Sequence, residues 1–393
     1  MSGRAAPIHV VDATMFWSST GGGVRRYLLA KQAWFASRAG WRHSIAVPGV
    51  ADASGFLSLP SVPLPMSGGY RLPLRRGGGA RVLAASRPNL IEAGDPYRVA
   101  WSVRDAASAL GIPAVAYCHS NLEAMARLTF GGASGGVTGD IAGRSARRYL
   151  RHVYSGFDLV LAPSRSMLGR LVEAGVEHAL CQPLGVDTGV FHPSRASPAW
   201  RRDLGIDADA RVLIYAGRFA PEKHLDVLAD AVARLGSPYV LVVVGAGPRP
   251  PATGDRVRVL PFMASAEALA TALASADAFV HAGDQETFGL SALEALACGT
   301  PIVVPAAGGL GELIDAGSGH SVAERSGSAF AAAIEATFEI DRAHWRGSAR
   351  QRAEAYDWDR VFASLTGHYL RLLARGQPSR TRPAPLPQLS RRP

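Results

Sequence analysis

Two carboxylates stand close together in the stretch DQETFGLSALEALACGTPIVV, residues 284–304. Glu286 and Glu294 are separated by seven residues, and their oxygens can accept hydrogen bonds from hydroxyl groups. The apolar run 277–283 predicts a strand, and the Gly299 that follows LSALEALAC predicts the end of a helix. Glu286 is therefore expected in the loop at the end of a strand, and Glu294 about one turn into the next helix.

Three backbone amides lie between these carboxylates, at the expected start of the helix. The amides of Phe288, Gly289 and Leu290 have no partner inside the helix and can bind an anion such as phosphate. One carboxylate can then accept hydrogen bonds from sugar hydroxyls, and the other from a pair of ribose hydroxyls. A nucleotide sugar fits this arrangement.

Two cations follow another apolar run, in YAGRFAPEKHLDVL. Arg218 comes directly after the predicted strand, and Lys223 is expected in the first turn of a helix that Pro221 begins. Cations at a helix N-terminus oppose the helix dipole unless an anion also lies there, and a bound diphosphate would remove this conflict. The alternative is a surface ion-pair cluster with Glu222 and Asp226.

The first half of the chain holds two further candidates. The triplet Gly21, Gly22 and Gly23 follows the first predicted strand and lets the backbone approach a ligand closely. His119 is a titratable group at the end of a later strand. A flexible turn for the glycines and a hydrogen-bonded loop histidine for His119 are the alternatives without a ligand.

The elements that must position these residues alternate between short apolar runs and helical stretches. This alternation predicts two doubly wound α/β domains, in which ligands bind beyond the carboxyl ends of parallel strands. The predicted strands are 7–13, 43–49, 89–94, 113–119, 158–164, 211–217, 239–247, 256–262, 277–283 and 301–306.

The Gly- and Pro-rich segment 183–198 separates the two series of strands and is the expected linker. We therefore predict Rossmann-like domains over 1–190 and 191–357. An amphipathic helix is expected over 358–374, followed by a disordered Pro/Arg tail over 375–393.

The basic charge of the chain belongs to its first half. Residues 1–190 hold 20 Lys and Arg against 11 Asp and Glu, whereas residues 191–393 hold 22 against 21. This asymmetry predicts an anionic partner for the first domain, and no motif favours nucleic acid. No run of about 18 apolar residues and no secretory signal is present in the sequence, so a cytoplasmic location is expected.

Part of this basic charge is expected on one face of a helix. Arg144, Arg147, Arg148 and Arg151 recur at i, i+3, i+4 and i+7, which places them on one face of a helix. Such a face predicts reversible attachment to an anionic membrane, and the alternative is an ordinary solvated surface.

Metal and redox chemistry are not expected. The strings DAD at 207–209 and DWD at 357–359 do not follow core strands, so both are interpreted as structural. Cys118, Cys181 and Cys298 lie in apolar runs without metal-ligand spacing, which predicts buried thiols. No cofactor and no divalent metal is expected.

Four motifs, which occur along the chain in the family's order, resemble those of the retaining glycosyltransferases of family 4. ETFGLSALE followed by ALACGTPIVV resembles their paired-glutamate signature, and YAGRFAPEKHLDVL resembles their phosphate-binding segment. STGGGVRRYL resembles their N-terminal glycine loop, and PLGVDTGVFHP resembles their interdomain linker. The resemblance covers about residues 8–374 and implies the GT-B fold, with the C-terminal helix crossing back to the first domain.

The resemblance also implies residue roles. Arg218 and Lys223 would hold the donor diphosphate, Glu286 the transferred sugar and Glu294 the ribose. Gly22 and Gly23 would approach the phosphate or the acceptor, and His119 would contact the sugar near the reacting centre.

The resemblance further implies a same-face displacement with retention, from a nucleotide sugar to a lipid or glycan acceptor. The loop GGGVRRY resembles that of bacterial mannosyltransferases and so favours GDP-mannose as the donor, although the motifs do not fix base, sugar or acceptor. Two alternatives are a sugar-nucleotide isomerase of the same architecture and a non-catalytic membrane-associated scaffold.

Overall fold

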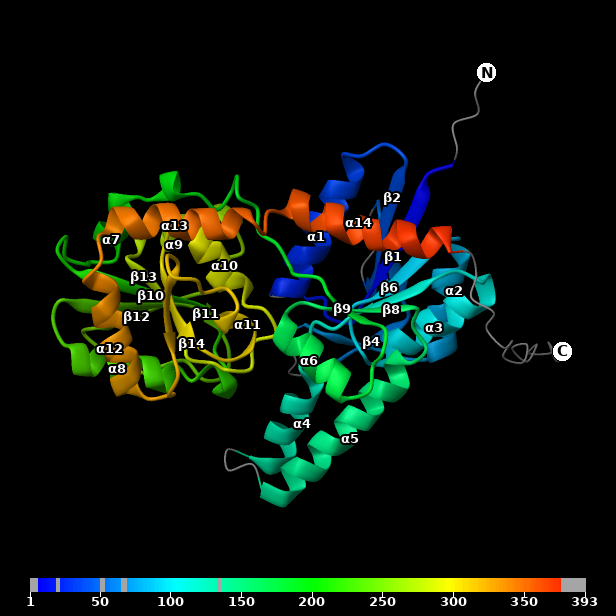
Figure 1. Ribbon diagram of the computed structural model, residues 1–393, viewed down its shortest axis with the longest axis horizontal. Helices are drawn as coiled ribbons and strands as arrows, with labels where there is room; N and C mark the ends of the chain where they lie inside the picture. The colour runs from blue at the N-terminus through cyan, green and yellow to red at the C-terminus, as the bar shows by residue number, and fades with distance from the viewer. Residues whose placement is uncertain (1–5, 19–21, 50–53, 65–68, 133–135, 376–393) are drawn as a thin grey trace.

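The computed structural model describes residues 6–18, 22–49, 54–64, 69–132 and 136–375, and it contains two parallel sheets (Figure 1). The first sheet has seven strands in the order β3-β2-β1-β6-β7-β8-β9. Their bounds are β1 Ile8–Ala13, β2 Trp41–Pro48, β3 Phe56–Leu59, β6 Leu90–Ala93, β7 Ala114–Tyr117, β8 Leu159–Ala162 and β9 Ala179–Cys181. A separate antiparallel pair consists of β4 Ser61–Pro63 and β5 Arg71–Pro73.

The second sheet has six strands in the order β12-β11-β10-β13-β14-β15. Its central strands are continuous apolar runs such as YVLVVVGA, as expected for strands covered on both faces. The bounds are β10 Arg211–Arg218, β11 Tyr239–Ala246, β12 Val257–Leu260, β13 Ala278–Val280, β14 Ile302–Pro305 and β15 Gly319–Val322.

Helices cover these sheets (Figure 1). Those of the first half are α1 Gly23–Ala36, α2 Arg76–Ala85, α3 Arg98–Leu110, α4 Leu122–Gly131, α5 Gly136–Tyr154 and α6 Arg165–Glu173. Those of the second half are α7 Pro198–Asp203, α8 Leu225–Leu235, α9 Ala266–Ser275, α10 Leu290–Ala297, α11 Gly308–Gly311, α12 Gly327–Phe338, α13 Arg342–Glu354 and α14 Trp358–Ala374. Two 3-10 turns are η1 Pro193–Arg195 and η2 Pro221–Lys223.

The predicted fold class is confirmed. Each of the ten predicted strands corresponds to a strand of the two parallel sheets. Among the strands of the parallel sheets, β3, β9 and β15 were not predicted; they are edge strands of three or four residues with at least two positions not fully buried. Such half-covered edges carry no continuous apolar run.

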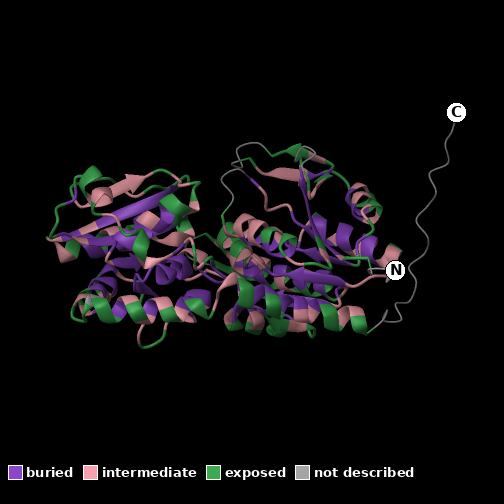
Figure 2. Cartoon of the chain, turned by 90° about the horizontal axis from the view of Figure 1, so that it is seen from above, coloured by how far each residue is buried: buried purple, intermediate pink, exposed green. Residues whose placement is uncertain are grey.

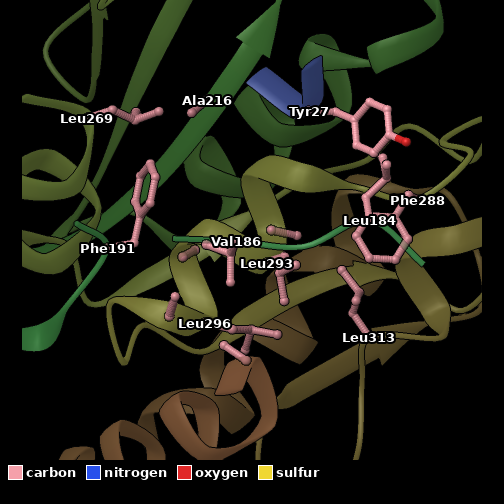
Figure 3. Packing of buried hydrophobic residues seen from close by; sticks show 14 of the residues in the cluster. Tyr27, Leu184, Val186, Phe191, Ala216, Leu269, Phe288, Leu293, Leu296 and Leu313 are labelled. Carbon is pink, nitrogen blue, oxygen red and sulfur yellow. The ribbon is translucent and has the colours of Figure 1, made fainter. Parts of the chain in front are cut away.

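The apolar core continues from one domain into the other. The strands are buried in the middle of each domain, and exposed residues line the outer faces of the helices (Figure 2). The connecting segment contributes Leu184, Val186 and Phe191 to the same cluster as Leu293 of α10 and Tyr27 of α1 (Figure 3). Because this cluster includes both domains and their connection, the two domains pack against each other through apolar contacts.

Helix α14 crosses back to the first domain, as predicted, and a buried polar cluster attaches it there (Figure 1). The fully buried Lys31 of α1 donates to Asp12 at 2.8 Å, to Glu92 at 3.1 Å and to the Tyr369 hydroxyl of α14 at 2.7 Å. A buried ammonium group is tolerated only with such partners, so docking of Tyr369 helps to complete the environment of Lys31.

Two local predictions, for Pro221 and Cys181, are wrong, and two others are not tested. Pro221 begins a 3-10 turn rather than an α-helix, because His224 has a left-handed φ of 49° and α8 begins at Leu225. Cys181 is exposed, since it ends the edge strand β9. The domain limits stay a prediction, and nearly all of the tail 375–393 lies outside the described residues.

Candidate functional site

The candidate residues of the second half gather where β10 and β13 end. Arg218 is the last residue of β10, and Glu286 lies in the loop between β13 and α10. Gly289 caps α10 with a φ of 100°, and a Cβ there would collide with the Leu310 side chain. Only glycine suits this turn, which presents the N-terminus of α10 at the carboxyl edge of the sheet.

Glu286 lies between two donors. Its Oε1 pairs with the Lys223 ammonium group and lies 3.2 Å from His281 Nε2. His281 Nδ1 accepts from the Gly283 amide at 3.0 Å, so the ring proton of a neutral His281 lies on Nε2 and is donated to Glu286. Burial alone would raise the pKa of Glu286, but the charge of Lys223 and the bond from His281 hold that pKa well below its usual range.

Arg218 has a different environment. Its guanidinium group is largely exposed and donates to Glu222 at 2.6 Å, four residues along the chain. This contact is part of the surface-pair alternative, but an exposed pair of this kind contributes little and leaves Arg218 able to turn toward an anion. Asp226, at the start of α8, has no recorded ion pair with either cation among the described residues.

Glu294 is buried in α10 and faces the first domain. One carboxylate oxygen pairs with Arg26 of α1, whereas Oε2 is buried without a partner among the described residues. The charge of Glu294 raises the pKa of the Arg26 guanidinium. Arg26 therefore fixes one oxygen of Glu294, and the other oxygen can accept a hydrogen bond from a ligand.

The glycine loop meets the same helix. A Cβ at Gly23 would lie 2.7 Å from the Leu290 side chain, so glycine permits the N-termini of α1 and α10 to approach each other. Gly22 caps α1, and no atom of the described residues lies within 4 Å of the place where its Cβ would be. Gly21 lies outside the described residues.

His119 lies on the other side of this junction. Its ring stacks on Tyr117 with centroids 4.3 Å apart, and its backbone oxygen accepts from the Thr287 hydroxyl at 3.2 Å. Both ring nitrogens are buried without a recorded partner in the described part of the chain. Burial, and then the charge of Lys31, lower the pKa of His119 to about 3, so the ring is neutral near pH 7.

The structure thus brings Glu286, Lys223, Glu294, Phe288, Gly289, Leu290, Gly23 and His119 to one junction between the domains, with Arg218 at its edge. Two residues at this junction, His281 and Arg26, were not predicted from the sequence. His281 stands at the end of a strand, the same signal that selected His119. Arg26 carried no signal, because its partner Glu294 is 268 residues away in the chain.

The two Asp-x-Asp strings do not directly follow core strands, and their interpretation as structural stays a prediction. Asp357 accepts a hydrogen bond from the Asp359 amide and caps α14, and Asp207 and Asp209 lie at the turn before β10. Within the ranges that the structure describes, no group of three or more His, Cys, Asp or Glu side chains is arranged to hold a metal ion.

The comparisons with known proteins agree with this architecture. Residues 21–190 match the description Glycosyltransferase Family 4, and residues 196–353 match Glycosyl transferases group 1. The chain belongs to glycosyltransferase family 4.

Among curated proteins, the chain is similar to a GDP-mannose-dependent alpha-(1-6)-phosphatidylinositol dimannoside mannosyltransferase of Mycobacterium tuberculosis. The identity is 31% over 374 residues, covering 91% of this chain and 95% of that protein. It is also 32% identical to a GDP-mannose-dependent alpha-mannosyltransferase of Mycolicibacterium smegmatis, covering 75% and 76% of the two chains.

Two solved structures show the same fold. One is Anabaena HepE in complex with UDP and glucose, with a TM-score of 0.71, 19% identity, and coverage of 92% and 99% of the two chains. The other is sucrose-phosphate synthase of Thermosynechococcus elongatus, with a TM-score of 0.75, 20% identity, and coverage of 93% and 100%.

We expect Arg26 to act on nucleotide binding through Glu294. Arg26→Ala and Glu294→Gln should each weaken nucleoside diphosphate binding, and their effects should be non-additive by about 1–2 kcal/mol, as found for residues in direct contact. Titration calorimetry of both single variants and the double variant measures this coupling. Arg25→Ala is a matched control, because the Arg25 guanidinium lies over the Trp17 ring instead. Additive losses would contradict the role of Arg26.

Proposed function

We propose that this glycosyltransferase moves a hexose from a nucleotide sugar to a lipid or glycan acceptor with retention of configuration, and that the donor is GDP-mannose. The observation that carries the proposal is the pair of carboxylates on one loop and the helix that follows it. Glu286 is held ionised beside Lys223 and His281, and Glu294 has a buried oxygen without a recorded partner among the described residues. The two mannosyltransferase relatives are GDP-mannose-dependent, which favours GDP-mannose as the donor here.

In this proposal Glu286 holds the hydroxyl groups of the transferred sugar, and Glu294 holds the ribose. Arg218, Lys223 and the amides of Phe288, Gly289 and Leu290 bind the diphosphate, whose negative charge grows as it departs. Gly22, which has no neighbour within 4 Å of its Cβ position among the described residues, would admit a phosphate or the acceptor at the N-terminus of α1. The neutral ring of His119, whose nitrogens have no partner in the described part of the chain, would provide one hydrogen-bond donor and one acceptor beside the sugar.

Retention is proposed to proceed by displacement on a single face of the sugar. A double displacement needs a carboxylate nucleophile close beneath the sugar ring. The two site carboxylates are otherwise engaged, Glu286 with Lys223 and Glu294 with Arg26. Rate enhancement would then come from positioning and from stabilisation of the leaving diphosphate.

We propose that no divalent metal is required. Arg218 and Lys223 supply positive charge where the diphosphate would lie, and such cations can stabilise a leaving phosphate group without an ion. Activity should survive treatment with EDTA, measured as transfer or hydrolysis of the nucleotide sugar. Complete loss that only Mn²⁺ or Mg²⁺ restores would overturn this part of the proposal.

The acceptor side is proposed to work at the cytoplasmic face of an anionic membrane. Arg144, Arg148 and Arg151 are exposed on α5, as the prediction of a basic face requires. Arg147 differs, because it pairs with Glu123 of α4. No helix in the described residues is long and apolar enough to cross a membrane.

Incubation with a labelled nucleotide sugar tests the proposal against its alternatives. Transfer to an acceptor, or slow hydrolysis without one, is the expected result. Release of an epimerised or isomerised sugar nucleotide would favour an isomerase, and absence of turnover with every donor would favour a scaffold. A thermal-shift screen of nucleotide sugars selects the donor, and GDP-mannose is expected to give the largest stabilisation.

A further inference from the structure

The helices α4 and α5 form a hairpin that projects from the first domain (Figure 1). Glycines let the two helices approach closely, since a Cβ at Gly139 would lie 2.9 Å from both the Arg127 carbonyl oxygen and the Gly131 Cα. Glu123 of α4 also binds Arg147 of α5 through two hydrogen bonds. These contacts make the hairpin a preformed, well-packed unit.

The outer part of this hairpin is apolar. Twelve large apolar side chains are exposed in the described part of the chain, and five of them lie within residues 125–141: Met125, Leu128, Phe130, Val137 and Ile141. Phe130 is 66% exposed and Val137 75% exposed. Exposed apolar groups gathered on one projecting element mark an interaction surface.

One face of α5 changes from apolar to cationic along its length. Val137, Ile141, Arg144, Arg148 and Arg151 follow each other at i, i+4, i+7, i+11 and i+14, so they share a single face. The three arginines also line a hollow of about 340 Å³ with Arg147, Ser145 and Ala174. The apolar residues occupy the outer end of the face, and the arginines lie nearer the domain.

We propose that this hairpin docks onto an anionic lipid bilayer. The apolar side chains at its outer end enter the boundary between headgroups and acyl chains, and Arg144, Arg148 and Arg151 meet the lipid phosphates. A bilayer matches both parts of the face. Its apolar interior would meet the apolar outer end, and its phosphates, which lie above that interior, would meet the arginines nearer the domain. This docking rests on the proposed function, because it assigns a lipid as the acceptor of the transferred sugar.

The hairpin begins at the candidate site. Asn121 caps α4 by accepting from the Ala124 amide, and its side chain lies 3.5 Å from Gln285 in the loop that carries Glu286. His119 precedes it by two residues. The α4–α5 hairpin therefore begins beside the proposed reacting centre, and its outer end would contact the bilayer. This arrangement suits an acceptor lipid that stays in the membrane.

A second copy of the chain fits this surface less well. Two such faces packed antiparallel would set the arginines of one copy against the apolar end of the other, and parallel packing would set arginine against arginine. Either arrangement buries unpaired charge, which is costly. Charge complementarity therefore favours an anionic bilayer.

Co-sedimentation with vesicles of phosphatidylcholine alone, or with added phosphatidylglycerol, tests the proposal. The wild-type chain should bind the anionic vesicles at low salt and detach as salt screens the charges. A variant with Phe130→Ser, Val137→Ser and Ile141→Ser, and a second with Arg144→Ser, Arg148→Ser and Arg151→Ser, should each bind on the order of tenfold less. Val172→Ser on α6 and Arg202→Ser on α7 are matched controls, because both residues are exposed outside the hairpin.

A fluorescent reporter locates the contact. Val137→Trp should show a blue shift and resistance to an aqueous quencher with anionic vesicles, and Val172→Trp should not. Unchanged vesicle binding of both serine variants, or a concentration-dependent dimer that the apolar variant abolishes, would overturn the proposal. Unchanged nucleoside diphosphate affinity in calorimetry shows that the variants remain folded.

The two proposals can fail separately. Sugar transfer by a wild-type chain that does not bind anionic vesicles would overturn only the docking. Vesicle binding through the hairpin by a chain that turns over no nucleotide sugar would overturn the proposed function and leave the docking surface in place.

Discussion

Glu286→Gln is expected to lower kcat by on the order of a hundredfold or more, with the KM for the donor little changed. The carboxylate lies between Lys223 and His281, and in the proposed function it holds its negative charge beside the transferred sugar. As positive charge develops on the sugar during transfer, that negative charge stabilises the transition state more than the bound donor. Glutamine keeps the shape and can still accept the hydrogen bond from His281, but it lacks the charge.

Steady-state kinetics with the preferred nucleotide sugar measure this effect. Glu222→Gln is the matched control, because Glu222 is an acidic residue of the same region that pairs with the exposed Arg218. A Glu286→Gln variant with wild-type turnover would remove Glu286 from the mechanism. A parallel loss in both variants would indicate a general effect on the loops rather than a role at the sugar.

Replacing Arg218 or Lys223 with alanine should weaken binding of the nucleoside diphosphate by roughly 2 kcal/mol, the scale of a lost charge-assisted hydrogen bond. The two variants should differ in turnover. Lys223→Ala also removes the cation beside Glu286, so it should lower kcat, whereas Arg218→Ala should act mainly on diphosphate affinity.

Calorimetry with the nucleoside diphosphate measures the affinity directly. Arg234→Ala is the matched control, since Arg234 forms an exposed pair with Asp230 four residues away, the same spacing as Arg218 and Glu222. If both site variants bind the diphosphate as tightly as the wild type, Arg218 and Lys223 do not bind it, and the surface-pair interpretation holds.

Local sequence patterns predicted the parts of the site that are adjacent in the chain. Glu286, Gly289 and Glu294 belong to one strand, loop and helix, so apolar periodicity and a helix boundary were sufficient to place them. The two-domain fold was predictable for the same reason, because buried parallel strands are continuous apolar runs.

Contacts between distant elements were not predictable in this way. Arg26 pairs with Glu294 across 268 residues, and Lys31 binds Tyr369 across 338 residues, so no local pattern records either contact. The apolar end of the α4–α5 hairpin is similar. Val137 and Ile141 have the spacing of core residues, and only their exposure in the folded chain distinguishes them from a buried helix face.

The most direct test of the central claim is the fate of GDP-mannose labelled with ¹³C at the anomeric carbon, followed by NMR in the presence of the chain. The mannose is expected to leave GDP and to be observed first in the α configuration that it has in the donor. The Glu286→Gln variant should reduce this rate at least a hundredfold, in line with the expected loss of transition-state stabilisation. A first product in the β configuration would contradict retention. A donor that stays intact, with every other nucleotide sugar also left intact, would contradict the assignment of this junction as a site of sugar transfer.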